Sequence, residues 1–264
     1  MTQIQDFTPI TELPGARLNQ EQWYRFTHRY TFGAARAVGR RVLEVACGAG
    51  IGLGYLGSAA RQVVGMDVTA SLLLRAQAHH GADTPLLGGD AQQMPFADGS
   101  FDLVLCFEAI YYLQNPASFC AESRRILAAD GTLLIALSNP DWPDFVPGAM
   151  RTHYPAVPEL AQLLGHAGFR SVQFFGILPV SATPPRQAFA NHLRHRVLQV
   201  GMLHKMAGPA ANLLKAALYG RLQPLPGKLE APAAGTPLEP PLLTAIPADR
   251  PDGVHRVIYA LADL

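Results

Sequence analysis

The chain has 264 residues, of which 49% are hydrophobic and 16% charged, a globular composition rather than a disordered one. Its net charge of +1 argues against a protein built around a polyanion such as nucleic acid. Three cysteines form no CxxC pair, which fits a reducing compartment and predicts no metal site. No apolar run approaches the ~20 residues of a membrane span. The first residues carry Asp6 and Glu12 and do not resemble a signal peptide, so we expect a cytoplasmic protein without a transmembrane segment.

Periodic segments predict the order of the elements. A helix is expected over residues 20–37, where Trp23, Phe26 and Tyr30 share one face. Short apolar segments then alternate with amphipathic ones. Strands are expected at 41–46, 62–66, 86–87, 101–107, 132–138, 171–177 and 254–261, and helices at 50–60, 69–79, 117–128 and 158–167. This alternation predicts an α/β fold, a Rossmann-like, seven-stranded, mostly parallel sheet with helices on both faces.

The expected elements divide the chain into three parts. Residues 1–38 are expected to form an N-terminal helical lid, residues 39–177 with 252–264 the α/β core, and residues 178–251 a helical and Pro-rich insertion before the last strand. No acid occurs between Arg170 and Lys228, so the insertion suits an anionic or lipid-linked acceptor or peripheral contact with a membrane surface. Its helices would also serve a homodimer, and the sequence leaves these roles open.

A glycine-rich turn follows the first expected strand of the core. Gly48 and Gly50 stand where a nucleotide-binding site forms at the carboxyl end of a strand. A dinucleotide fingerprint needs a third glycine, but Leu53 or Tyr55 occupies that position in either frame. The spacing therefore disfavours a nicotinamide cofactor, and the phosphate-loop pattern is absent.

Three acids occur at the ends of three consecutive expected strands. Glu44 precedes the glycine turn, where a carboxylate repels phosphate and suits a ligand with a cationic end. Asp67 ends the second strand, where a carboxylate can accept from both ribose hydroxyls. Asp90 follows the third strand, where it can accept from an exocyclic amine. Together the acids describe a nucleoside with an amino-acid tail and no phosphate.

Over roughly residues 40–140 the sequence resembles the small-molecule branch of class I S-adenosylmethionine-dependent methyltransferases. Its glycine loop, ribose motif (64–69), adenine motif (89–96), and fourth and fifth strands (101–110 and 127–134) occur in the family's order. The resemblance implies S-adenosylmethionine as cofactor and S-adenosylhomocysteine as product. It also implies a set of cofactor-binding residues: Glu44, Ala46, Gly48, Gly50, Asp67, Val68, Asp90, Ala91 and Phe107.

A narrower resemblance bears on the acceptor. Residues 28–30, 108–113, 139–145 and 254–261 resemble methyltransferases of surface-polysaccharide pathways, which implies a hydroxyl of a sugar or sugar-lipid. Two alternatives stay open, a methyltransferase of an isoprenoid quinone or other lipophilic natural product, and a non-catalytic sensor or scaffold. The motif that nucleic-acid amino methyltransferases carry after the fourth strand is absent, so no nucleic-acid substrate is expected.

The predicted acceptor site lies beside the end of the fourth strand. Glu108, Tyr30, Tyr111 and Tyr112 are the candidate substrate-binding residues. A hydroxyl acceptor also needs a base near neutral pH, and histidine is the usual choice. His153 and His28 are the candidate catalytic bases.

Overall fold

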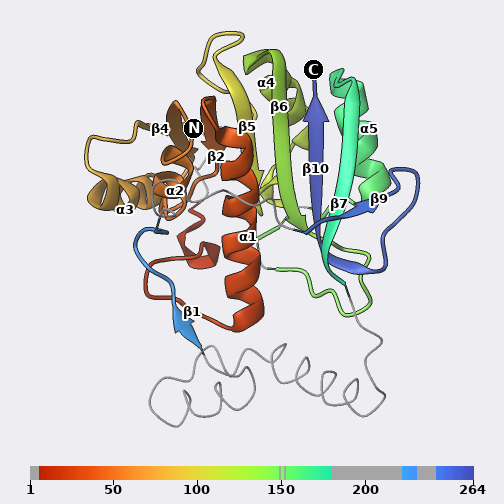
Figure 1. Ribbon diagram of the computed structural model, residues 1–264, viewed down its shortest axis with the longest axis horizontal. Coiled ribbons are helices and arrows are strands. Elements are labelled where there is room, and N and C mark those ends of the chain that lie inside the picture. The colour runs from red at the N-terminus through yellow and green to blue at the C-terminus, as the bar shows by residue number, and fades with distance from the viewer. Residues whose placement is uncertain (1–5, 149, 152, 180–221, 231–241) are drawn as a thin grey trace.

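The computed structural model describes residues 6–148, 150–151, 153–179, 222–230 and 242–264 (Figure 1). Its helices are α1 (Gln20–Ala37), α2 (Leu53–Gly57), α3 (Ala70–His80), α4 (Pro116–Ile126) and α5 (Val157–Ala167), with 3-10 turns η1 (Thr8–Ile10) and η2 (Ile110–Tyr112). Its strands are β1 (Arg17–Leu18), β2 (Arg41–Val45), β3 (Gln62–Asp67), β4 (Leu86–Gly88), β5 (Phe101–Phe107), β6 (Leu127–Ser138), β7 (Ser171–Pro179), β8 (Gln223–Pro224), β9 (Thr244–Ile246) and β10 (His255–Asp263).

The main sheet has the strand order β4-β3-β2-β5-β6-β10-β7-β9. The five strands from β4 to β6 pair in parallel, whereas β10 runs antiparallel to both of its neighbours. The strand order reverses between β2 and β5, which creates the crevice where open α/β sheets bind their ligands. This arrangement confirms the predicted α/β, Rossmann-like fold.

The sheet differs from the expected one by an eighth strand. The three residues of β9 lie in the segment expected to be a Pro-rich loop, and they pair with β7 at the sheet edge. A strand this short carries little periodic signal, but its Ile246 is buried against the core. Residues 180–221, which hold the helical part of the expected insertion, lie outside the described residues.

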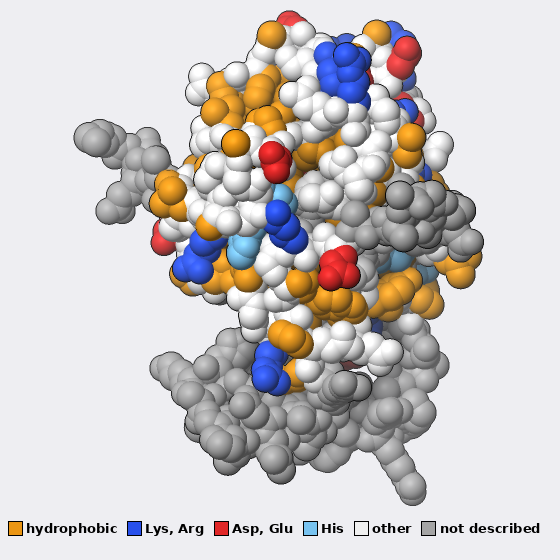
Figure 2. Space-filling model, turned by 60° about the vertical axis from the view of Figure 1, so that its left-hand side comes forward, with side chains coloured by type: hydrophobic (Ala, Val, Ile, Leu, Met, Phe, Trp, Pro, Cys, Tyr) orange, Lys and Arg blue, Asp and Glu red, His pale blue; other side chains and the backbone are white. Residues whose placement is uncertain are grey.

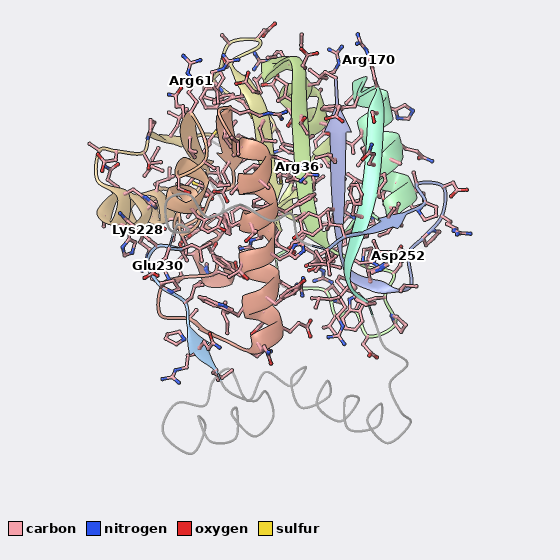
Figure 3. All side chains as sticks on the ribbon, viewed as in Figure 1. Arg36, Arg61, Arg170, Lys228, Glu230 and Asp252 are labelled. Carbon is pink, nitrogen blue, oxygen red and sulfur yellow. The ribbon has the colours of Figure 1, made fainter. Side chains whose placement is uncertain are left out.

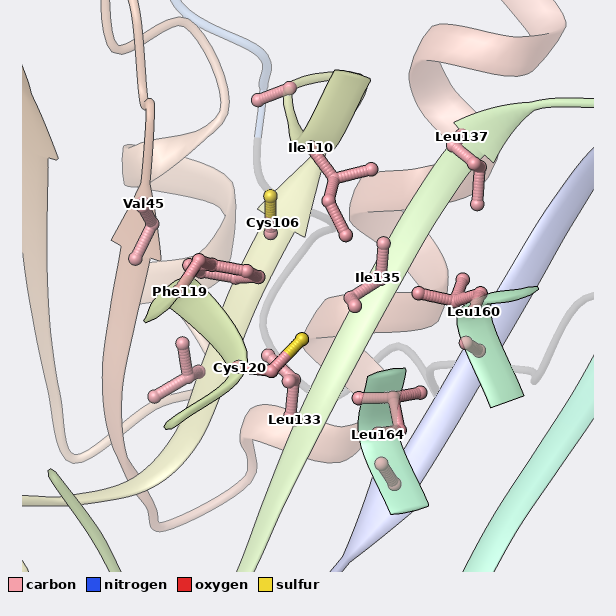
Figure 4. Close-up of a cluster of buried hydrophobic side chains, with 14 of the residues drawn as sticks. Val45, Cys106, Ile110, Phe119, Cys120, Leu133, Ile135, Leu137, Leu160 and Leu164 are labelled. Atoms are coloured by element: carbon pink, nitrogen blue, oxygen red, sulfur yellow. The ribbon is translucent and has the colours of Figure 1, made fainter. Parts of the chain in front are cut away.

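Two apolar cores lie on opposite faces of the sheet. Successive residues of β5 belong to different cores. Val104 packs with α4 and α5 in the first core, and Leu105 packs with α1 and α2 in the second. Figure 4 shows the first core, where Phe119 and Leu160 cover the strands. Burial on both faces explains why the central strands read as continuous apolar runs.

Local signals set the ends of the helices. Asn19 forms a capping box with Gln22, so α1 begins where the sequence predicted. By contrast, α2 is shorter than the expected helix because the glycine turn continues to Gly52. None of the helices in the described ranges is long and apolar enough to cross a membrane.

Both signs of charge occur on the face shown in Figure 2, where Lys and Arg side chains are interspersed with Asp and Glu. Hydrophobic side chains are scattered between them. The charge on this face is mixed rather than of a single sign.

Candidate active site

A cavity of about 860 Å³ opens at the carboxyl ends of β2, β3, β4 and β5. The face of α1, the N-terminal segment from Phe7 to Glu12, and η2 form its other walls. All of the predicted cofactor-binding and substrate-binding residues except Gly50 line it. Its volume lies in the upper part of the usual range for ligand sites, which leaves room for a cofactor together with a second molecule.

The glycine turn after β2 has a backbone that few residues adopt. Gly48 has φ +57° and Gly50 has φ +70°, the left-handed region where glycine meets no steric penalty. Ala46 also has a positive φ of 56°, which is strained for a residue with a side chain. A Cβ atom on Gly48 would lie 2.9 Å from Cγ2 of Thr11, so the N-terminal segment lies directly against the turn.

Asp67 joins the end of β3 to the glycine turn. Its carboxylate accepts hydrogen bonds from the backbone N–H of Gly48 and of Thr69, each at 2.8 Å. Burial raises the pKa of Asp67, although these two donors act in the opposite direction. Each oxygen keeps a further lone pair for a ligand hydroxyl. The carboxylate therefore shapes the turn and still faces the cavity.

Glu44 is a buried carboxylate with one unpartnered oxygen. Its Oε1 accepts from the Tyr30 hydroxyl at 2.7 Å, whereas its Oε2 has no hydrogen-bond partner within the described part of the chain. Burial raises the pKa of Glu44 to about 7. Tyr30 also packs edge-on against Phe107, with ring centroids 5.5 Å apart. An unpaired buried acid is costly, so this atom suits a ligand that brings a cation or a donor.

The predicted adenine site lies along the rim of the cavity. Asp90 is exposed and accepts from the backbone N–H of Gln92 at 2.8 Å. Ala91 is buried and Val68 half-buried, and all three residues line the cavity.

Glu108 is the centre of a polar network on the acceptor side. It has a positive φ of 53° directly after β5. Its Oε2 accepts from the Tyr111 hydroxyl at 2.8 Å and from the backbone N–H and hydroxyl of Ser138 at 3.1 and 3.0 Å. Arg25 donates to Oε1 at 3.2 Å. Burial alone would raise the pKa of Glu108, but Arg25, Arg29 and these hydrogen bonds lower it, so the carboxylate stays ionised.

Aromatic rings cover this network. Phe7 and Tyr112 lie with ring centroids 5.6 Å apart, and Tyr111 stacks on Tyr154 at 4.0 Å. Of these four rings, only that of Tyr154 is absent from the cavity wall.

The two candidate histidine bases lie away from the described cavity wall. His28 is buried in the core, where Nδ1 lies 2.8 Å from the Tyr259 hydroxyl and burial lowers its pKa to about 4. The His153 side chain is 65% exposed, and its Nε2 lies 2.7 Å from the Glu159 carboxylate in α5. Among the described residues no cluster of histidines, cysteines and acids suits a metal ion.

Several cavity residues were not among the predicted site residues. Gln22, Arg25, Phe26 and Arg29 line the cavity beside Tyr30. Their spacing of three and four residues places them on one face of α1, a signal that was available in the sequence. Arg29 is buried and pairs with Glu12, which ties α1 to the N-terminal segment. That segment has no periodicity from which its position over the cavity could be predicted.

The central part of this chain is similar to known methyltransferases. Residues 43–135 match the family model described as a methyltransferase domain. A "Probable S-adenosylmethionine-dependent methyltransferase" of Mycolicibacterium smegmatis is 30% identical over 173 residues, which cover 62% of this chain and 65% of that protein. Demethylmenaquinone methyltransferase of Renibacterium salmoninarum is 29% identical over 150 residues, covering 56% and 61%. The chain thus spans less than two-thirds of the length of each of these relatives.

Among solved structures, a methyltransferase of Archaeoglobus fulgidus that depends on S-adenosylmethionine has a TM-score of 0.54 and 13% identity, and the match covers 92% of this chain and 91% of that one. At that identity the likeness shows the fold alone. The matched segment, residues 43–135, and the sequence relatives make this chain similar to S-adenosylmethionine-dependent methyltransferases.

Proposed function

We propose that this protein transfers the methyl group of S-adenosylmethionine to a hydroxyl of a small-molecule acceptor. The first candidate for the acceptor is a sugar or sugar-lipid. The observation that carries the proposal is that the strand-end acids and the Glu108 network line the same cavity. The bound cofactor would supply an activated methyl group on a positively charged sulfur. In-line alignment of two bound reactants contributes up to ~7–11 kcal/mol to lowering a barrier.

The cofactor end of the cavity fits a cation. Glu44 offers its unpartnered buried oxygen, and Asp67 and Asp90 add further carboxylates around the same wall. In this proposal Asp67 holds the ribose hydroxyls, Asp90 with Ala91 contacts the adenine edge, and Val68 covers its face. Gly48 allows the backbone to approach the methionyl part, Gly50 lets the turn adopt its left-handed conformation, and Phe107 closes the site beside the methionyl part.

The acceptor end combines polar groups that orient a ligand with rings that exclude water. Glu108 stays ionised and can accept from an acceptor hydroxyl, while Tyr111, Tyr112 and Phe7 bring aromatic surface. Ligand sites of this kind use a few placed polar groups within an apolar wall. A sugar offers hydroxyls to the polar groups and apolar ring faces to the aromatic side chains.

Proton removal falls to His153 in this proposal, because Glu159 can orient its imidazole as a carboxylate orients a base. The ring is outside the described cavity wall, so the role requires the loop that follows β6 to bring it inward. His28 is the weaker candidate, since it is packed in the core against Tyr259.

A lipophilic acceptor such as a quinone is the second candidate. Phe7, Ile10, Phe26 and Leu113 give the cavity an apolar side, and one relative is named as a demethylmenaquinone methyltransferase. Purified protein would be incubated with S-adenosylmethionine labelled in the methyl group and with panels of glycosides, glycolipids and reduced quinones. Transfer to glycosides or glycolipids supports the first candidate, and transfer to quinones alone replaces it with the second. Binding of the cofactor without transfer to any acceptor would favour a sensor or scaffold.

A further inference from the structure

We propose that His80 is a positioning residue for the cofactor: it holds the glycine turn in shape from the side that faces away from the cavity. His80 is the last residue of α3 and is absent from the cavity wall. The inference rests on the proposed function, because it concerns the affinity for S-adenosylmethionine.

A buried hydrogen bond carries the proposal. Nε2 of His80 lies 2.7 Å from the carbonyl oxygen of Gly50, and the histidine is 5% exposed. A carbonyl can only accept, so Nε2 bears the proton and donates it. Burial lowers the pKa of His80, which keeps the ring neutral and Nδ1 unprotonated at neutral pH.

The ring also fills the space between α3 and the turn. A Cβ atom on Gly50 would lie 2.8 Å from Cβ of Ala76 and 3.4 Å from Cδ2 of His80. A Cβ atom on Gly54 would lie 3.4 Å from Cε1 of the same ring. The imidazole therefore lies against the turn at Gly50 and against α2 at Gly54, and it contributes shape as well as a donor.

The next carbonyl of the turn is held in the same way. Ile51 O accepts from the backbone N–H of Leu229 at 2.8 Å. Figure 3 shows Lys228 and Glu230, which flank Leu229, on the same side of the molecule as α2 and α3. Two successive carbonyls are thus fixed from outside, while Ala46, Gly48 and the rest of the cavity side remain available to a ligand.

Fixing the turn matters because its backbone is unusual. Gly48 and Gly50 both have positive φ, and glycine can adopt many other backbone conformations. A turn without support would therefore have to become ordered when the ligand binds. Ordering a loop before the ligand arrives improves affinity by removing that cost. His80 and Leu229 act on the affinity for the cofactor and touch no acceptor.

The test compares isothermal titrations of S-adenosylmethionine into four variants. His80→Phe keeps a ring but removes the donor, and we expect Kd to rise roughly three- to tenfold, the usual net value of one hydrogen bond. His80→Gln restores a donor at the Nε2 position and should recover most of the affinity. His166→Phe, an exposed histidine in α5, is the matched control and should bind like the wild type.

Leu229→Pro removes the second donor outside the α3 packing and should weaken binding by a similar factor. It decides the matter if His80→Phe does not fold. If His80→Phe folds and binds S-adenosylmethionine with wild-type affinity, the inference is overturned. If His80→Phe does not fold, wild-type affinity in Leu229→Pro overturns it. An equal loss of affinity in His80→Phe and His80→Gln also overturns it. Failure of the wild-type protein to bind S-adenosylmethionine would instead overturn the proposed function, and this inference with it.

Discussion

Replacing Glu44 with glutamine should change how the stability of the ligand-free protein depends on pH. Burial raises the pKa of Glu44 from 4.5 to about 7. The folded chain therefore binds this proton more tightly than the unfolded chain. The stability that Glu44 contributes is complete below pH 4.5 and is lost as the pH rises through 7. A shift of this size corresponds to about 3–4 kcal/mol at most, at ~1.4 kcal/mol for each pKa unit.

Urea unfolding of the wild type and of Glu44→Gln between pH 4.5 and 8 measures this contribution. Subtracting the two curves removes the shifted groups that do not interact with Glu44. We expect the unfolding free energy of the wild type, relative to the variant, to fall by up to about 3 kcal/mol over that range. A difference that does not change with pH would show that Glu44 is ionised in the ligand-free protein, and would refute the reasoning from its unpartnered oxygen.

Three further predictions concern single side chains. Gly48→Ala places a Cβ atom at φ +57° and 2.9 Å from Thr11, so urea unfolding should show a loss of about 1–2 kcal/mol or more. Arg25→Met removes the ion pair between Arg25 and Glu108 and should destabilise the fold by about 1–3 kcal/mol at pH 7. That loss should shrink as the pH falls below 4.5, because Arg25 helps to lower the pKa of Glu108. His153→Ala should bind S-adenosylmethionine normally and lose turnover; full activity would exclude it as the base.

The sequence predicted the sheet well because its central strands are buried on both faces. Val104 and Leu105 belong to opposite cores, so β5 is apolar from Leu103 to Phe107. The strand-end acids were equally visible, since parallel strands bring their carboxyl ends to one edge. The apolar strands and the strand-end acids are local features of the chain, so the sequence pattern alone shows them.

Features that depend on distant partners were not visible in the same way. Arg25 and Arg29 look like solvated helix residues until Glu108 and Glu12 are placed beside them. The role of His80 depends on a carbonyl thirty residues away, and nothing in the α3 sequence marks it. The three residues of β9 are too few to show a strand pattern in the sequence, and their pairing with β7 is seen only in the structure.

The most direct test of the account is calorimetric titration of the purified protein with S-adenosylmethionine, S-adenosylhomocysteine and NAD in parallel. The strand-end acids and the glycine spacing predict micromolar binding of both adenosyl ligands and no binding of NAD. Binding of NAD, or of neither adenosyl ligand, would contradict the assignment of this cavity to S-adenosylmethionine.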